Sequence, residues 1–261
     1  MDDQPTQFEA DPRPRYQMTL AYDGTNFHGW QKQVPSGGQP LRTVAGVVEE
    51  ALQRLLRQPI TLVGASRTDS GVHAKGQVAH FNADVVIPIE KLPHAINSRL
   101  LEDVEVLAVE PIHPAFDAIS DAVSKQYRYR IFNTRRRPLN KRHYVWHCWA
   151  RLDVDRLAGA AGRFVGTHDF AGFAAAAHGR TTTVRTILDC HVQTAHPEVQ
   201  VVVVGNGFLY NMVRIITGTL VEIGRGRFEP DQIDKVLESG DRRAAGPTLP
   251  ARGLCLEWIK Y

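Results

Sequence analysis

The chain has 261 residues, 43% of them hydrophobic, and a formal net charge of +3. This length and apolar content allow one large folded domain or two small ones. The balance of 31 basic against 28 acidic residues excludes a histone-like protein, so any affinity for nucleic acid has to come from local basic patches. The three cysteines are odd in number and widely spaced, which argues against a disulfide framework or a four-cysteine metal site and favours a reducing cytoplasm.

The first 14 residues are polar, mainly acidic and contain three prolines. This composition predicts a disordered tail over 1–14 and excludes a secretory signal. No segment approaches the roughly 20 consecutive apolar residues that a membrane-spanning helix needs. We therefore expect a cytoplasmic protein with no membrane association.

The segment 15–113 combines predicted strands with predicted helices. Apolar residues at every second position predict a strand over 15–22. Apolar residues at helical spacing predict a helix over 43–56, with Thr43 as its N-cap. The same criteria predict strands over 60–63, 76–81 and 104–109 and a helix over 88–100.

Two loops of this segment mix aromatic, charged and glycine residues. The loop 25–33 reads T-N-F-H-G-W-Q-K-Q; Phe27 and Trp30 either stack on bases or close the end of a core, and the second interpretation is favoured. The second loop lies within 64–81, G-A-S-R-T-D-S-G-V-H-A-K-G-Q-V-A-H-F. Loops held on rigid strands often carry reactive groups, yet Asp-Ser-Gly is also a common turn sequence, and local chemistry alone favours a turn role for Asp69.

The segment 114–261 begins with a strictly alternating strand over 123–132. Lys125, Tyr127 and Tyr129 fall on one face, while Arg128 and Arg130 on the other predict a wet, basic surface. The loop that follows has five cations, suited either to binding phosphates or to plain solvation. These cations are Arg135, Arg136, Arg137, Lys141 and Arg142.

The order of the later elements echoes the first segment. Helices are predicted over 154–164, 208–223 and 231–237, and strands over 182–194, 199–204 and 253–260. The echo predicts an α+β fold of two similar ferredoxin-like halves, 15–113 and 114–261. We expect one continuous, mainly antiparallel sheet with a central basic cleft, because clefts between such halves are favoured ligand sites.

Arg214 is the only cation in the apolar helical run 208–220. Because burying an unpaired charge is costly, Arg214 needs a carboxylate partner, and Asp69 of the other half is the obvious candidate. Such a pair keeps the carboxylate ionised and oriented, ready to act as a nucleophile or base. A purely structural ion pair, or an arginine that reaches solvent, explains the pattern equally well.

Six stretches in order closely resemble the tRNA pseudouridine synthase A (TruA) family. They are A-Y-D-G-T-N-F-H-G-W-Q, S-R-T-D-S-G-V-H-A-K-G-Q-V-A-H-F, K-Q-Y-R-Y-R-I, G-T-H-D-F, V-R-T-I and N-M-V-R-I-I-T-G-T-L-V-E-I-G-R-G. The resemblance implies two α+β subdomains around a basic cleft, a homodimer, and no metal or organic cofactor. It also implies isomerisation of uridine to pseudouridine at positions 38 to 40 of tRNA, in the anticodon stem-loop.

The resemblance also implies roles for single residues. Asp69 matches the catalytic aspartate, and Arg214 matches the arginine paired with it. Tyr127 matches the tyrosine that stacks on the target uracil, and Leu254 falls where the family has an apolar residue under the base. Arg67 matches the arginine that contacts RNA and helps to open the target base pair. We further expect His28 and the basic loop to contact phosphates of the stem.

Three positions depart from the family pattern. Ser66 and Ser70 stand where glycine and alanine are usual, which are small-for-small changes that leave catalysis credible. Ile119 stands where an arginine often occurs, and Arg128 or Arg130 is the candidate to take its place in the RNA path.

Two other functions compete with this interpretation. The first is a noncatalytic RNA-binding protein of two ferredoxin-like halves, with Tyr127 and Tyr129 as stacking platforms. The second is a metal-dependent phosphohydrolase that uses Asp69, although no recognisable ligand spacing relates the nearest candidates. Those candidates are Asp169, His73 and His168.

Overall fold

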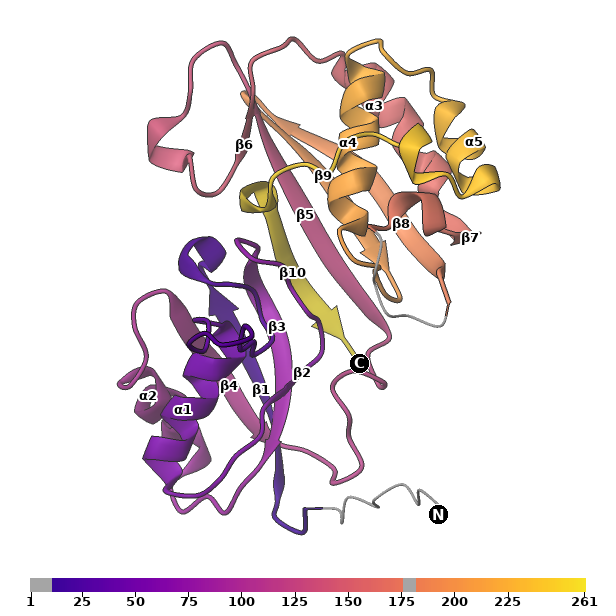
Figure 1. The fold of residues 1–261 in the computed structure, drawn as a ribbon. Helices are drawn as coiled ribbons and strands as arrows, with labels where there is room; N and C mark the ends of the chain where they lie inside the picture. The colour runs from indigo at the N-terminus through magenta and orange to yellow at the C-terminus, as the bar shows by residue number, and fades with distance from the viewer. Residues whose placement is uncertain (1–10, 176–181) are drawn as a thin grey trace.

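Residues 11–175 and 182–261 are described by the computed structural model of the protein. Across these residues one sheet runs in the order β4-β1-β3-β10-β5-β9-β8-β7, with β2 paired to β3 and β6 paired to β5 (Figure 1). The strands are β1 (Arg15–Tyr22), β2 (Val63–Gly64), β3 (His73–Asn82), β4 (Val104–Pro111), β5 (Ser124–Asn133), β6 (Trp146–Cys148), β7 (Gly166–Asp169), β8 (Val184–Ala195), β9 (Glu198–Gly205) and β10 (Leu254–Lys260). The α-helices are α1 (Val44–Leu56), α2 (Leu92–Asn97), α3 (Val154–Ala161), α4 (Met212–Gly224) and α5 (Gln232–Ser239).

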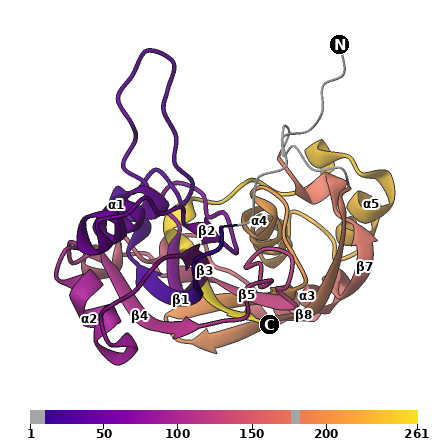
Figure 2. The same ribbon diagram turned by 90° about the horizontal axis from the view of Figure 1, so that it is seen from below.

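The helices and the sheet share one main core. In Figure 2, α1 and α4 lie on the same side of the sheet. Met18 and Leu20 of β1 are fully buried in one cluster with Val48 and Leu52 of α1. The apolar stripe of an amphipathic helix is stable here because it covers the apolar face of the strands. The predicted α+β class with a mainly antiparallel sheet is confirmed.

The last strand of the chain lies in the middle of the sheet. β10 forms a parallel pair with β3 at Cys255 and Leu256. It forms an antiparallel pair with β5 along most of its length. Because β3 lies in 15–113 and β5 in 114–261, the sheet is continuous across the predicted boundary. Side chains from both parts of the chain can therefore meet near β3, β10 and β5.

Two elements of the first part differ from their prediction. Thr43 caps α1 as predicted. The predicted strand 60–63 is corrected to β2, because the N–H of Leu62 donates to Glu49 Oε2 at 3.0 Å instead of to a neighbouring strand. The predicted helix 88–100 is shortened to α2, preceded by one 3₁₀ turn.

In the second part, the predicted helix 208–223 begins later than expected. Asn211 adopts a left-handed conformation with φ +63°, so α4 starts at Met212. The pattern does not predict β6 or β7, since neither has a run of alternating apolar residues. Across the described parts of the chain, no helix is long and apolar enough to cross a lipid bilayer.

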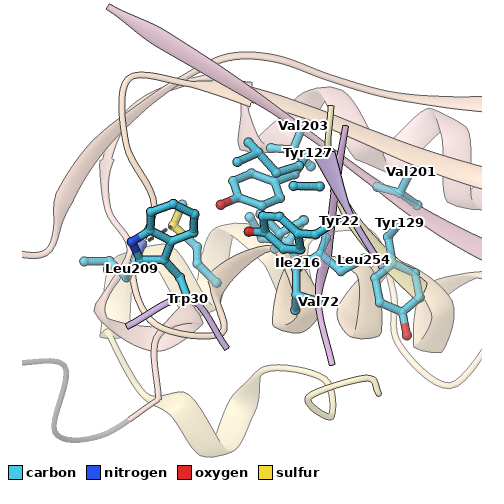
Figure 3. Packing of buried hydrophobic residues seen from close by; sticks show 14 of the residues in the cluster. Tyr22, Trp30, Val72, Tyr127, Tyr129, Val201, Val203, Leu209, Ile216 and Leu254 are labelled. Atoms are coloured by element: carbon cyan, nitrogen blue, oxygen red, sulfur yellow. Dashed lines mark hydrogen bonds between the residues drawn. The ribbon is translucent and has the colours of Figure 1, made fainter. Parts of the chain in front are cut away.

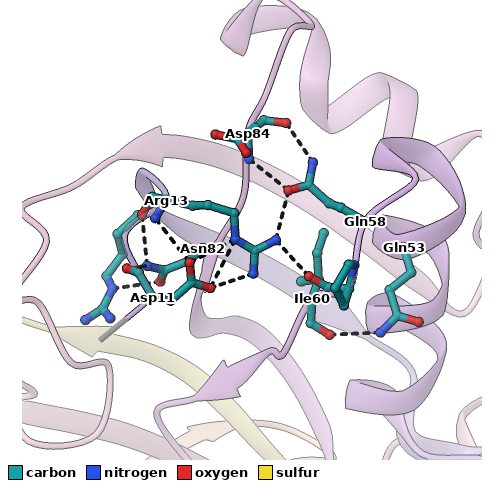
Figure 4. A network of polar contacts seen from close by, with 9 residues as sticks. Asp11, Arg13, Gln53, Gln58, Ile60, Asn82 and Asp84 are labelled. Atoms are coloured by element: carbon teal, nitrogen blue, oxygen red, sulfur yellow. Dashed lines mark hydrogen bonds and ion pairs between the residues drawn. The ribbon is translucent and has the colours of Figure 1, made fainter. Parts of the chain in front are cut away.

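The segment before β1 is held by polar contacts (Figure 4). Arg13 donates from Nη1 to Gln58 Oε1 at 2.9 Å. Asn82 donates from Nδ2 to the carbonyl oxygens of Asp11 and Arg13, at 3.1 and 3.0 Å. The first ten residues of the predicted disordered tail lie outside the described residues, whereas these bonds anchor its last four.

Candidate active site

The predicted catalytic residue Asp69 lies in the loop 65–72, which connects β2 to β3. We call it the catalytic loop after this prediction. The last backbone bond between these strands runs from Ala65 N to β3 at 2.8 Å. Beyond it the loop leaves the sheet, and side chains hold it instead. The hydroxyl groups of Thr68 and Tyr22 lie 2.7 Å apart, and both residues are buried. The strand β1 therefore supports the loop from within the core.

The loop 25–33, the aromatic loop, packs against the catalytic loop. The N–H of Trp30 donates to Thr68 O at 3.0 Å, and the N–H of Gly71 donates to Phe27 O at 3.2 Å. Gly29, with φ +87°, lies so close to the backbone of the catalytic loop that a Cβ there would be 2.7 Å from Thr68 O. Phe27 and Trp30 are only 2% and 3% exposed, so they close the end of a core, as the favoured interpretation predicts.

Arg214 reaches the catalytic loop from the first turn of α4. Its Nη1 lies 3.0 Å from Asp69 Oδ2 and 2.5 Å from Asn211 Oδ1. Its Nε donates to the carbonyl of Leu249 at 2.6 Å. The side chains of Asp69 and Arg214 are 19% and 16% exposed. The ion pair expected from the sequence is therefore present and mostly buried.

The carbonyl that binds Arg214 is placed by the segment 245–250, which crosses α4. Gly218 permits this crossing, because a Cβ there would lie 1.9 Å from Pro247 O. The segment then presents the Leu249 carbonyl to the guanidinium. Arg214 is consequently fixed on three sides before any substrate arrives.

Two effects on the Asp69 carboxyl oppose each other. Burial raises its pKa above the ordinary value, and the hydrogen bond and charge of Arg214 lower it. The guanidinium thus favours the ionised form in a place that water reaches poorly. A carboxylate held in this way can act as a nucleophile or a base.

Tyr127 of β5 lies close to the catalytic loop. It is 5% exposed, packs edge-on against Phe208 with ring centroids 5.1 Å apart, and has its hydroxyl 2.9 Å from Ser66 Oγ. Figure 3 shows the hydroxyl groups of Tyr127 and Tyr22 pointing to the same side, whereas that of Tyr129 points away. Burial raises the pKa of the Tyr127 phenol well above its usual value, so the phenol is neutral.

A cleft of 660 Å³ adjoins the catalytic loop, β5 and the turn before α4. Its volume falls within the range of about 300–1,000 Å³ that is usual for ligand sites. Among the described residues that line it, the only carboxylate is Asp69, against the three cations Arg67, Lys125 and Arg185, so the cleft is basic as predicted. Five of the six predicted site residues line the cleft, and the sixth, Arg214, binds Asp69. The five are His28, Arg67, Asp69, Tyr127 and Leu254.

These predicted residues differ in exposure. Arg67 and His28 are exposed. Within the described ranges, Arg67 makes no hydrogen bond or ion pair, so its guanidinium is available to a ligand. Leu254 is 6% exposed and stands opposite Tyr129 in the ladder of β10 and β5.

The predicted basic loop, 135–142, does not line the cleft. In Figure 1 the segment between β5 and β6 extends beyond the end of the sheet. Lys141 pairs with Glu198 at 2.6 Å. Just after the loop, the Tyr144 hydroxyl donates to Asp23 Oδ2 at 2.6 Å. The loop is thereby tied to both parts of the chain, at a distance from Asp69.

Arg128 and Arg130 point to the opposite face of β5 from the cleft. Their nearest guanidinium nitrogens lie 3.2 and 3.7 Å from Glu257 Oε1. Neither lines the cleft, so the expectation that one of them replaces the arginine missing at Ile119 is wrong. Arg185 of β8, for which the sequence predicts no role, lines the cleft together with Ile119.

The candidate ligands of the alternative metal site are not brought together. His73 accepts at Nδ1 from Gly24 N–H at 3.1 Å and donates from Nε2 to His143 O at 2.9 Å. His168 and Asp169 belong to β7, at the far edge of the sheet. Among residues 11–175 and 182–261, no group of three or more His, Cys, Asp or Glu side chains is placed to hold a metal.

The alternative of a stacking platform fails for Tyr129. This residue is fully buried, and its hydroxyl donates to Pro250 O at 2.7 Å. Gly253 packs against its ring so closely that a Cβ there would lie 2.6 Å from it. Tyr129 is therefore a core residue that no base can reach.

Three further contributors to the site have no role predicted from the sequence. Asn211 holds Arg214, and Phe208 supports the ring of Tyr127. Lys125 donates from Nζ to the Ala65 carbonyl at 2.6 Å. A signal did exist for Lys125, since it is the one cation on the buried face of the alternating strand.

Fold and site together define an α+β protein whose basic cleft holds a buried carboxylate–arginine pair beside a buried tyrosine. The chain belongs to the tRNA pseudouridine synthase family, whose model matches residues 18–119 and 160–261. It is therefore an isomerase, and pseudouridine formation in tRNA is the activity of its family. The family and the reaction predicted from the six stretches are confirmed.

Individual relatives are similar over nearly the whole chain. The chain is 45% identical over 248 residues to tRNA pseudouridine synthase A of Moorella thermoacetica, covering 95% of this chain and 100% of that protein. It is 43% identical over 249 residues to the Bacillus pumilus protein of the same name, covering 95% and 99%. A solved archaeal box H/ACA sRNP Nop10-Cbf5 complex gives a TM-score of 0.34 at 10% identity, over 93% of this chain and 67% of that chain, a likeness too weak to carry an argument.

Proposed function

We propose that this protein converts uridine to pseudouridine at positions 38 to 40 of the tRNA anticodon stem-loop, with Asp69 as the catalytic carboxylate. The observation that carries the proposal is the ion pair of Asp69 and Arg214, placed at a basic cleft in a chain of this family. The choice of positions is supported by the six stretches that resemble tRNA pseudouridine synthase A.

The reaction needs one carboxylate beside the sugar. The N1–C1′ glycosidic bond breaks, the free uracil rotates, and C5 joins C1′; the hydrogen on C5 leaves and N1 gains a proton, so no atoms are lost overall. Asp69 can attack C1′, attack C6 of the base, or remove a proton from the sugar. Each route uses the ionised carboxylate, which Arg214 favours.

The target uridine has to leave a base-paired stem, which costs a few kcal/mol. Tyr127 offsets part of this cost by stacking on the uracil, with Leu254 under the base. Because Phe208 already packs against the Tyr127 ring, the stacking surface is formed in advance. Arg67 enters the stem to keep the base pair open, and His28 contacts a phosphate.

The basic loop 135–142 binds a part of the tRNA away from the flipped nucleotide. Arg135, Arg136 and Arg137 are exposed, and contacts of this kind position a nucleic acid without reading its sequence. The loop lies outside the cleft, so its phosphates are not those beside Asp69. It adds affinity that falls as salt rises.

The protein acts as a cytoplasmic homodimer and uses no metal or organic cofactor. The resemblance to the family supports the dimer and the lack of a cofactor. The three cysteines are buried and unpaired, which fits a reducing compartment.

The test is to incubate the purified protein with unmodified tRNA transcripts and to map pseudouridine along each one. We expect product at positions 38 to 40 wherever the transcript has uridine there, and the same yield in the presence of EDTA. Product at other positions alone would contradict the assigned positions. Activity lost to the chelator would contradict the metal-free reaction.

A further inference from the structure

Gln77 of β3 is fully buried beneath the catalytic loop and has no role in the proposed chemistry. Its Nε2 donates to the carbonyl of Ser66 at 2.6 Å, and its Oε1 accepts from the N–H of Ser66 at 3.2 Å. One side chain thus holds both backbone groups of one loop residue. Such a two-ended contact fixes position and orientation together.

The course of the chain explains why an amide is needed at this point. The backbone ladder between the catalytic loop and β3 ends at Ala65, whose N–H donates to Val78 O at 2.8 Å. The next residue, Ser66, bonds to the side chain of β3 and not to its backbone. A primary amide offers the same donor and acceptor as a peptide group. The Gln77 side chain therefore replaces the backbone hydrogen bonds that β3 no longer makes to the loop at Ser66.

Ser66 also connects the catalytic loop to the opposite wall of the cleft. Its hydroxyl lies 2.9 Å from that of Tyr127. Lys125 of the same strand donates to the neighbouring Ala65 carbonyl at 2.6 Å. Asp69 follows only three residues after Ser66. A displacement of Ser66 would therefore change the position of the carboxylate relative to the tyrosine ring.

We infer that Gln77 is a positioning residue for pseudouridine formation. By holding both backbone groups of Ser66, it sets the distance between the Asp69 carboxylate and the uracil that stacks on Tyr127. This inference rests on the proposed function of Asp69 and Tyr127. Affinity for tRNA comes mainly from cations. Gln77 therefore controls the rate at which bound tRNA is converted to product, and not the affinity for tRNA.

The chain contains a matched control at another place. Asn97 of α2 holds Val106 of β4 in the same two-ended way, with Nδ2 donating to Val106 O at 2.9 Å and Oδ1 accepting from Val106 N at 2.8 Å. Neither residue lines the cleft. Asn97→Leu thus removes the same bonds without touching the site.

The first experiment compares Gln77→Leu with Asn97→Leu for thermal stability, Kd for a tRNA transcript and the single-turnover rate of pseudouridine formation. For Gln77→Leu we expect an unchanged Kd and a rate lower by roughly 10- to 100-fold, since a misplacement of about 1 Å can cost about 100-fold. For Asn97→Leu we expect a similar loss of stability and the wild-type rate. Equal rates in the two variants would overturn the inference.

The second experiment uses Gln77→Glu and the pH dependence of its rate relative to wild type. A protonated Glu side chain can donate to the Ser66 carbonyl and accept from its N–H, as the amide does. The ionised form can only accept, so it repels that carbonyl, and burial raises the pKa at which it forms. The ratio of variant to wild-type rate should therefore be highest in acid and fall as pH rises. Taking the ratio cancels the titration of Asp69, which both proteins share.

A ratio that stays constant with pH while Gln77→Glu remains folded would overturn the inference. If Gln77→Leu does not fold, Gln77→Glu alone tests the positioning role of Gln77. Failure of the proposed function is recognised separately, because the wild-type protein would then form no pseudouridine. A wild type that is active, with Gln77 variants that behave like Asn97→Leu, would refute the positioning role alone.

Discussion

At the scale of single residues, the role proposed for Asp69 requires the ionised carboxylate, whereas burial of this side chain favours the protonated form. Burial raises its pKa, and Arg214 only partly opposes this. Because the folded-state pKa lies above the unfolded one, the contribution of Asp69 to stability is present below the unfolded pKa and is lost as pH rises through the folded pKa. The ionised carboxylate that the proposed role of Asp69 requires therefore lowers the stability of the fold.

Arg214→Met removes the group that lowers the pKa of Asp69. Burial then acts alone, so the pKa rises further and the acidic limb of the pH–rate profile moves to higher pH. The variant should also lose about 3–5 kcal/mol of unfolding free energy, because a buried charged group is left without its partner. Rates measured across the acidic and neutral range, together with denaturant unfolding, check both effects.

Arg225→Met is the control for this change. Arg225 is as buried as Arg214, at 18% exposure, and lies 3.0 Å from Glu222, away from the cleft. Glu222 keeps a second partner, because Arg227 Nη1 lies 3.0 Å from its Oε2. We therefore expect a smaller loss of stability and an unmoved acidic limb. An Arg214→Met profile that coincides with that of wild type would show that the ion pair does not control the carboxylate.

The ion pair could be predicted from the sequence because one cation in an apolar helix calls for a carboxylate. The other contacts of Arg214 could not be predicted from the sequence. The left-handed φ of Asn211 and the direction of the Leu249 carbonyl arise only when the backbone is folded. Ser66 shows the same limit: it looks like a small-for-small change, yet its hydroxyl bonds to Tyr127.

At the scale of elements, the catalytic loop is enclosed by the aromatic loop and is not a free hinge. A Cβ on Gly24 would lie 2.0 Å from Val72 O, and one on Gly29 would lie 2.7 Å from Thr68 O. These contacts join backbone to backbone, so no side chain can move aside to relieve a clash. Gly24, just before the aromatic loop, and Gly29, within it, are therefore required by the close approach of the catalytic loop.

Gly29→Ala should therefore damage the site more than Gly37→Ala. Both glycines have positive φ, at +87° and +72°, but a Cβ on Gly37 would meet no atom within 4 Å. Each variant bears the cost of the left-handed conformation, about 1–2 kcal/mol. Gly29→Ala adds overpacking of about 1–3 kcal/mol and displaces the catalytic loop. We expect this further loss of stability, and a lower rate of tRNA modification, only in Gly29→Ala. Denaturant unfolding and a tRNA modification assay measure the two effects. Equal effects in both variants would mean that the two loops are not closely coupled.

Elements with strong periodicity, such as α1 and β5, could be predicted from the sequence. Burial of one face fixes both the period and the register of such a segment. β2, β6 and β7 could not be predicted, because their neighbours hold them and their own pattern is weak. The run 60–63 illustrates this: Ile60 and Leu62 are buried, but the N–H of Leu62 bonds to the Glu49 side chain, so of this run only Val63 belongs to β2.

At the scale of the whole molecule, the site forms only when distant segments meet. Asp69, Tyr127, Arg214 and Leu254 come from four elements, and β10, near the end of the chain, lies between β3 and β5. The division into halves at 15–113 and 114–261 remains a proposal, and neither half alone contains the ion pair. Composition and spacing could indicate a cleft between halves, but they could not show that the basic loop lies outside it.

Replacing Arg136 and Arg137 by alanine tests whether the basic loop binds tRNA. Both side chains are exposed, so folding should be unchanged. Loss of two phosphate contacts should weaken binding and reduce the slope of log Kd against log salt by about 2. Lys91 and Arg99, equally exposed and outside the cleft, form the control pair. The same loss in both double variants would show that overall charge, and not the basic loop, controls affinity.

Asp69→Asn tests most directly whether this side chain carries the chemistry. The amide keeps the size of the carboxyl and an oxygen for Arg214, but it can act as neither nucleophile nor base. The measurement is Kd for one tRNA transcript and pseudouridine at positions 38 to 40 of that transcript, with wild type and variant in parallel. We expect equal Kd values, with pseudouridine formed only by the wild type. Pseudouridine formed by Asp69→Asn at the wild-type rate would contradict the catalytic role of Asp69.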